Sequence, residues 1–289
     1  MHIKKFVKEI FVFIVLNVII EIFVYYFIKL PRLAHYINNI QFFKTDIGSS
    51  LLWGYLQIVP LIIPIIIIFL YIGIYKKENS IVYLKLKNTL CYYSIIVGGI
   101  FASVIMFFIF AIEKVCALCK ITKSDKCNIL LLIVFFLGYI IQALKEELLY
   151  RGILFQGLME KNNYIIAMII SSAFFSLSHW GNRGFSLLAG TNLFLFGVVA
   201  CMLLKKSDCI WGIVSFHCLW NYLQGYVGGV EISGIEPETS IFTIKFLSNN
   251  SLLTGGLFGV EGSIFCTGCL LISIFILFWD ERRTNSYEE

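Results

Sequence analysis

Long apolar runs dominate this sequence and constrain its fold more than any other feature. A helix that crosses a bilayer needs about 20 mostly apolar residues, and eight runs approach or exceed that length. In chain order they are residues 6–28, 51–75, 91–113, 129–158, 164–181, 185–204, 209–226 and 262–279. The sequence therefore predicts an all-α, polytopic transmembrane bundle of about eight helices.

The composition favours a membrane protein over a soluble one. Hydrophobic residues make up 59% of the chain, charged residues make up 14%, and the mean hydropathy is +0.85. A soluble domain carries about 25% charged residues, and its surface could not cover so much apolar side chain. The net charge is +5, but the cations form no dense patch, so nucleic acid is not an expected partner. We expect a multi-pass protein of the cell membrane, in contact with the bilayer, and its composition suggests a bacterial source.

No long linker or repeat divides the chain, so we expect one membrane unit. Residues 1–128 supply N-terminal helices, residues 129–280 form the core, and residues 281–289 form a polar tail. The first apolar run is too long for a cleaved signal and contains Glu9 and Glu21, so it is expected to remain as a span. Lysine counts favour a cytoplasmic N-terminus, although the 114–128 loop on the opposite side also contains lysines.

The nine cysteines divide by their surroundings. Those in apolar runs are expected to be small buried side chains; they are Cys91, Cys201, Cys218, Cys266 and Cys269. Cys116, Cys119 and Cys127 cluster in a loop. Three thiols lack a fourth zinc ligand of their own, so the pattern favours a loop disulfide over a zinc site.

Charged residues interrupt the apolar run 129–158, where each costs at least about 2.5–3.5 kcal/mol at the centre of a membrane helix. Glu147 and Arg151 are spaced i, i+4 with the acid first, so they are predicted to pair. Glu146 points about 100° away around the helix and has Tyr150 at its own i+4 position. A carboxylate without a fixed partner is a candidate general base. A structural Glu–Arg cluster that locks two helices is the alternative.

Two of the four histidines, His179 and His217, lie in or near predicted spans. A short turn at residues 161–163 makes the flanking runs antiparallel neighbours. Glu146 and His179 each lie roughly 24 Å from that turn, at about 1.5 Å per residue. His217 and Asn221 share one helix face at spacing i, i+4. If the turns at 161–163 and 205–208 lie on one side, these four polar groups form one layer within residues 129–226.

Such a layer permits three kinds of chemistry. A carboxylate beside an imidazole can activate water, while a second imidazole and an amide stabilise an oxyanion, as in a hydrolase. Glu146, His179 and His217 could instead hold a divalent metal such as zinc with one position open to water, although no HExxH motif is present. A proton-coupled membrane transporter would use the same groups as a relay. Spacing alone leaves these alternatives open.

Three motifs occur in register along the predicted core. EExxxR occupies residues 146–151, FxxxH occupies residues 175–179, and HxxxN occupies residues 217–221. In this order they resemble the CPBP family of intramembrane proteases, which groups type II CAAX prenyl endopeptidases with Abi-like bacteriocin-processing and immunity proteins. The loop 252–263 is similar to a stretch found in bacterial members, so the resemblance covers about residues 130–280.

The resemblance implies an intramembrane endopeptidase that acts on a membrane-associated peptide or protein. Glu146 would be the base that activates water, assisted by His179, and His217 with Asn221 would form the oxyanion site. Glu147 and Arg151 match the second acid and the basic residue of the first motif. Bacterial peptide maturation or bacteriocin self-immunity is the role it implies, and a catalytically silent membrane scaffold is the alternative. Metal dependence, substrate identity and oligomeric state stay open.

Overall fold

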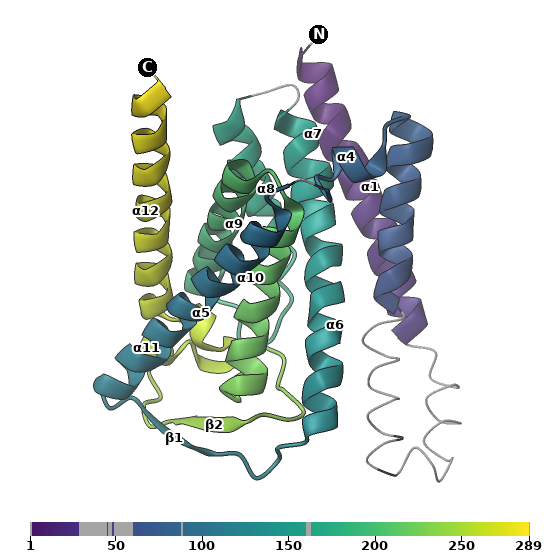
Figure 1. Cartoon of the computed structure of the whole chain (residues 1–289). Helices are drawn as coiled ribbons and strands as arrows, with labels where there is room; N and C mark the ends of the chain where they lie inside the picture. The colour runs from purple at the N-terminus through teal and green to yellow at the C-terminus, as the bar shows by residue number, and fades with distance from the viewer. Residues whose placement is uncertain are drawn as a thin grey trace.

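The computed structural model of the chain describes residues 2–28, 45, 48, 60–87, 89–159 and 163–288. Its helices form a bundle, and a two-stranded ribbon closes the end opposite the two termini (Figure 1). The longer helical elements are α1 (His2–Ile28), Pro60–Lys76, α5 (Cys91–Val115), α6 (Ile129–Glu147), η3 (Leu148–Phe155), α8 (Tyr164–Leu177), α9 (Leu187–Ser207), α10 (Ile210–Tyr222) and α12 (Ile264–Glu288). Shorter turns of helix are η2 (Tyr71–Lys76, the end of Pro60–Lys76), α4 (Ser80–Tyr83), α7 (Gln156–Met159), η4 (Leu223–Val227), α11 (Ser251–Thr254), η5 (Gly256–Phe258) and η6 (Val260–Gly262).

The predicted all-α membrane architecture is confirmed, while the predicted number of eight membrane helices is not confirmed by the described residues. Four described helices are long and apolar enough to cross a membrane; they are Cys91–Val115, Ile129–Met159, Leu187–Ser207 and Ile264–Arg283. Pro60–Lys76 and Tyr164–Leu177 are shorter apolar helices. Residues 51–59 of the second predicted span lie outside the described residues. Predicted run 164–181 is too long, because α8 ends at Leu177 and a turn follows, whereas run 209–226 agrees with α10 and its continuation as η4.

Helices α5 and α10 approach each other at the level of their backbones. A Cβ added to Gly98 would lie 2.0 Å from the carbonyl oxygen of Gly212, and one added to Gly212 would lie 2.9 Å from Cβ of Ser94. Small residues at a crossing allow this close approach within a membrane. Helix α10 is thereby seated between α5 and α6, in position to present its polar face to the bundle interior.

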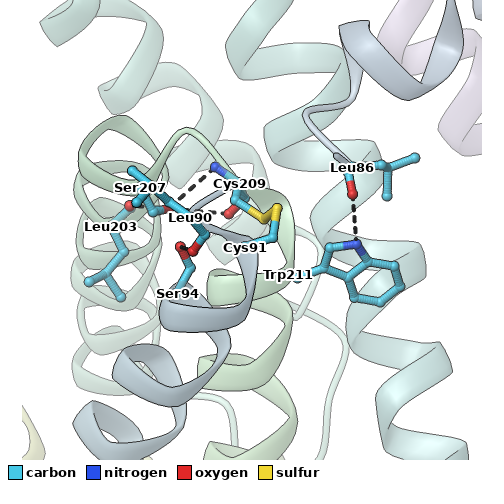
Figure 2. The surroundings of a disulfide bond; sticks show 8 residues. All are labelled: Leu86, Leu90, Cys91, Ser94, Leu203, Ser207, Cys209 and Trp211. Carbon is cyan, nitrogen blue, oxygen red and sulfur yellow. Dashed lines mark hydrogen bonds between the residues drawn. A yellow bond between two sulfur atoms is a disulfide. The ribbon is translucent and has the colours of Figure 1, made fainter. Parts of the chain in front are cut away.

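A disulfide joins the N-terminal ends of the same two helices (Figure 2). Cys91 bonds to Cys209 with their Cα atoms 5.4 Å apart, although 118 positions separate them in sequence. The expectation that Cys91 is a small buried hydrophobe was therefore wrong. The predicted loop disulfide is also wrong, because Cys116, Cys119 and Cys127 are all free thiols.

The two long loops at the far end pair with each other. Strand β1 (Cys119–Lys123) runs antiparallel to β2 (Phe242–Phe246), with Cys119 opposite Phe246 and Lys123 opposite Phe242. The sequence does not reveal this ribbon, because each strand has only five residues and its partner is more than 100 positions away. The ribbon ties the segment after α10 to the end of α5.

Candidate active site

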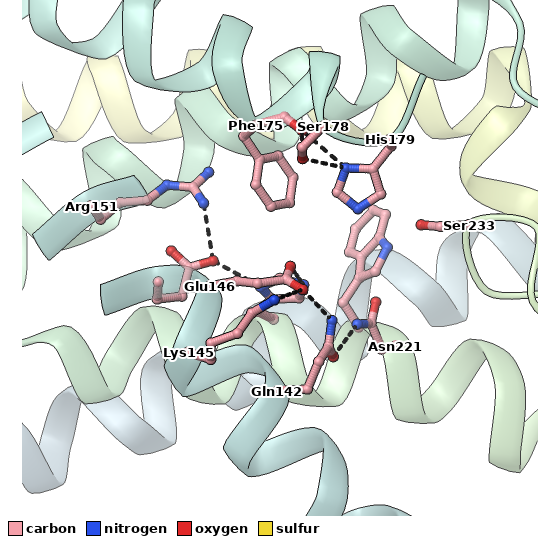
Figure 3. A network of polar contacts seen from close by, with 12 residues as sticks. Gln142, Lys145, Glu146, Arg151, Phe175, Ser178, His179, Asn221 and Ser233 are labelled. Atoms are coloured by element: carbon pink, nitrogen blue, oxygen red, sulfur yellow. Dashed lines mark hydrogen bonds and ion pairs between the residues drawn. The ribbon is translucent and has the colours of Figure 1, made fainter. Parts of the chain in front are cut away.

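A pocket of about 550 Å³ opens among α1, α6, α8, α9 and α10. Glu146, His179, His217 and Asn221 all line it, and the loop 232–238 contributes to its wall. Figure 3 shows Glu146, His179 and Asn221 around this common space. The structure thus brings together four side chains that come from three separate sequence motifs.

The first motif lies where α6 changes into the π-helix η3. Helix α6 ends at Glu147, and η3 begins at Leu148. The Glu147–Arg151 pair predicted from spacing is present: Nη1 of Arg151 lies 3.1 Å from Oε1 of Glu147, and both side chains are fully buried. The Arg151 guanidinium also lies 4.5 Å from the ring centroid of Phe175. π-Helical turns inside α-helices are common at functional sites, and this one follows directly after both acids.

Glu146 has more partners than its spacing indicates. Nε2 of Gln142 donates to its Oε1 at 2.8 Å, and Nζ of Lys145 lies 3.7 Å from the same oxygen. The expectation that Glu146 has no fixed partner was wrong, because Gln142 lies one turn earlier on the same helix. Its Oε2 is buried without a hydrogen-bond partner among the described residues and lies 3.8 Å from Nε2 of His217. This second oxygen is the one left for a ligand.

His217 is held by Glu147. Its Nδ1 lies 2.7 Å from Oε1 of Glu147, and the side chain is 4% exposed. The ring packs edge-on against Phe175 and Phe196, at centroid distances of 5.8 and 5.1 Å. A carboxylate accepts a hydrogen bond from Nδ1–H, so we assign Nδ1 as protonated and Nε2 as the atom that faces Glu146.

His179 lies beyond the helix that was expected to carry it. Helix α8 ends at Leu177, and His179 occupies the following turn. Its Nδ1 lies 2.9 Å from the carbonyl oxygen of Phe175, so this nitrogen is the donor and Nε2 is the acceptor. This turn, and not a continued helix, places the His179 ring at the pocket wall.

Several pocket residues were not identified from the sequence. Gln142 links two motifs, because it donates to Glu146 and its Oε1 accepts from Nδ2 of Asn221 at 3.2 Å. Lys145 bridges Glu146 and Glu21 of α1, lying 3.6 Å from Glu21. Gln142 could have been identified from the sequence, because it is a polar residue in an apolar run and lies one helical turn before Glu146. No local pattern links Glu21 to the pocket, because α1 reaches it through tertiary packing.

A metal is not a good fit to these side chains. Within the part of the chain that the structure describes, no group of three His, Cys, Asp or Glu side chains is arranged to hold a metal ion. Each ring keeps Nε2 clear of these Nδ1 contacts, as in a metal-ligating histidine, so the misfit lies in the arrangement of the three side chains and not in their ring nitrogens. We therefore assign no metal-dependent step to Glu146, His179 and His217.

Comparison with known families supports the motifs. Residues 128–223 match a family described as type II CAAX prenyl endopeptidase, Rce1-like, over about a third of the 289 residues. The match contains all six predicted site residues and confirms the family resemblance over this segment. A comparison with curated proteins found no match. With four membrane-length helices, the chain is a multi-pass integral membrane protein.

Proposed function

From the match of its central helices to a protease family, we propose that this protein is an intramembrane endopeptidase. It hydrolyses a peptide bond of a membrane-associated peptide or protein. The observation that carries the proposal is the pocket among the helices that Glu146, His179, His217 and Asn221 share, with all four side chains inside the matched segment. Buried ionisable groups are costly in a membrane, and they persist where they do chemistry.

Water is activated by Glu146 in the proposed reaction. Gln142 holds Oε1, so the unpartnered Oε2 accepts a proton as the water oxygen attacks the peptide carbonyl carbon. Nε2 of His179 accepts a hydrogen bond from the other O–H of that water and orients it, and this hydrogen stays on the oxygen that becomes part of the new carboxyl group. When the tetrahedral intermediate collapses, the C–N bond breaks, and the proton held by Glu146 passes to the leaving nitrogen. The carboxylate is then regenerated.

The negative oxygen of the intermediate is stabilised from α10. In the proposed step the His217 ring donates Nδ1–H to Glu147 and Nε2–H to the oxyanion. Asn221 donates one amide hydrogen to Gln142 and has a second available for the same oxyanion. Arg151 lies behind the ring and contacts the same Glu147 carboxylate at 3.1 Å. The site therefore contains a base and an oxyanion site without a side-chain nucleophile.

Glu146→Gln tests the proposal. The amide cannot accept the water proton, so cleavage is expected to fall at least about 10³-fold, within the range for loss of a general base. The measurement compares peptides from vesicles that contain wild-type or variant protein, with a co-reconstituted membrane peptide library as substrate. Glu113→Gln is the matched control, because Glu113 is a fully buried carboxylate of α5 outside the pocket. Full cleavage by Glu146→Gln rules out the assigned base.

The family resemblance and the bacterial character of the composition together suggest the substrate, which we propose is a bacterial peptide undergoing maturation or a bacteriocin in self-immunity at the cell membrane. Peptides that accumulate with Glu146→Gln and shorten with wild type identify the substrate and its cleavage site. The transporter alternative uses the same buried charges, and it requires pH-coupled uptake into proteoliposomes. Uptake without peptide cleavage would favour the transporter, and neither activity would favour the silent scaffold.

A further inference from the structure

Glu261 is a buried carboxylate that lines the pocket but belongs to none of the three motifs. It lies in η6 and is 3% exposed. Its Oε1 accepts from the backbone N–H of Ser233 at 2.5 Å and from the Ser233 hydroxyl at 2.6 Å. Its Oε2 accepts from Nε1–H of Trp220 at 3.0 Å. Three donors from two distant segments therefore converge on one side chain.

The Ser233 contacts reach the turn that contains His179. Ser233 has a φ of 48°, a left-handed conformation that a non-glycine residue adopts only when its surroundings hold it there. Its carbonyl oxygen accepts from Nδ2 of Asn182 at 2.9 Å, and the Asn182 N–H donates to the carbonyl of His179 at 3.0 Å. Glu261 thus holds Ser233 in place, and the turn that contains His179 is hydrogen-bonded to Ser233.

The Trp220 contact reaches the helix that contains His217. Trp220 lies one turn after His217 on α10 and directly before Asn221. Its indole ring contacts Phe196 at a centroid distance of 5.2 Å, and Phe196 contacts the His217 ring at 5.1 Å. The direction of the indole N–H is set by Glu261, so the same carboxylate constrains the packing beside the second histidine.

Glu261 is itself anchored from behind. Its backbone carbonyl accepts from Nδ2 of Asn192 on α9 at 2.8 Å, and Oδ1 of Asn192 accepts from the Thr267 hydroxyl on α12 at 2.6 Å. The preceding Gly259 has a φ of 99°, and a Cβ there would lie 2.0 Å from the carbonyl oxygen of Glu231. The carboxylate is therefore fixed to the bundle before it contacts either histidine-bearing segment.

We propose that Glu261 is a positioning residue that holds the His179 turn and the His217 helix at the separation required for peptide hydrolysis. The inference rests on the proposed function, because the separation matters only if both rings act on one substrate. A carboxylate accepts through two oxygens, whereas glutamine has one acceptor and one donor. Glutamine at 261 would therefore leave at least one N–H of Ser233 or Trp220 facing another donor.

A double-mutant cycle with Trp220 tests the hydrogen-bond logic. Glu261→Gln is expected to lower kcat about tenfold or more with KM within about twofold, since a buried unsatisfied donor costs at least one hydrogen bond. In a Trp220→Phe background the competing donor is gone, and the same change is expected to cost about threefold or less. Equal losses of kcat in the two backgrounds would overturn the positioning role.

Hydrogen–deuterium exchange tests the same idea without any activity. Glu261→Gln is expected to increase amide exchange in residues 178–186 and in residues 228–240. The wild-type carboxylate links these two segments through Ser233 and Asn182. Glu113→Gln, which removes a buried carboxylate outside the pocket, is expected to leave both segments unchanged. If the wild-type protein cleaves no peptide, the proposed function fails while the exchange data still decide the structural link. Unchanged exchange in Glu261→Gln contradicts the inference.

Discussion

Glu147, and not its neighbour Glu146, holds the His217 ring: its Oε1 lies 2.7 Å from Nδ1 of the imidazole. The same oxygen accepts from Nη1 of Arg151 at 3.1 Å, so a buried chain of three side chains lies behind the pocket. The adjacent acids therefore divide two tasks. Glu147 orients and polarises His217, and Glu146 keeps one oxygen for water.

Changing Glu147 to glutamine is expected to lower kcat at least about a hundredfold, because a neutral amide can turn either its oxygen or its NH₂ group toward Nδ1 and no longer places a negative charge beside the His217 ring. Substrate binding should change less, since Glu147 does not line the pocket. Turnover at saturating and limiting substrate in detergent separates kcat from KM. A rate within twofold of wild type would show that Glu147 does not act on His217.

Arg151→Met is expected to destabilise the protein by about 3–5 kcal/mol, because it leaves the buried carboxylate of Glu147 without its cation. Both side chains are fully buried, so water cannot replace the lost contact. Thermal unfolding in detergent measures the loss, and the double change Glu147→Gln with Arg151→Met should recover much of it. An unchanged melting temperature for the single variant would contradict the pairing.

Gly98→Ala is expected to destabilise the bundle by about 1–3 kcal/mol through overpacking. Its new Cβ would meet the Gly212 carbonyl oxygen, a backbone atom that cannot move without shifting α10. Gly268→Ala in α12 is the matched control, because no described atom lies within 4 Å of a Cβ added there. Equal stability of the two variants would argue against the close α5–α10 crossing.

Reduction of the Cys91–Cys209 disulfide is expected to lower stability by about 2–5 kcal/mol, since the bond closes a long loop. Thiol labelling of denatured protein, followed by mass measurement, should find seven free thiols before reduction. Nine are expected afterwards, the number of cysteines in the chain. Nine labelled thiols without reductant would show that the bond is absent in the purified protein.

Cleavage is expected to continue after metal chelation, because the proposed mechanism needs Glu146, His179, His217 and Asn221 alone. The measurement compares peptide cleavage before and after dialysis against a strong chelator. A loss that zinc restores would contradict this prediction and would assign Glu146, His179 and His217 as ligands. Loss that zinc does not restore would be compared with the melting temperature of the dialysed protein.

The sequence by itself determined the membrane class, the local pairs and the inventory of reactive groups. Apolar runs of membrane length predict spanning helices, because a lipid environment leaves the backbone few alternatives. Glu147 with Arg151, and His217 with Asn221, are within one helical turn, so the helix period alone places each pair on one face. The three motifs also identified the family segment that the comparison confirms.

Only the tertiary structure decided how these local units meet. Glu147 and His217 are 70 positions apart, Cys91 and Cys209 are 118 apart, and Trp220 and Glu261 are 41 apart. Helix periodicity carries no information across such separations. These contacts depend on which helices pack together, where α8 ends before His179, and how α6 changes into a π-helix. The packing of the helices therefore determined which acid holds the imidazole and which groups surround the pocket.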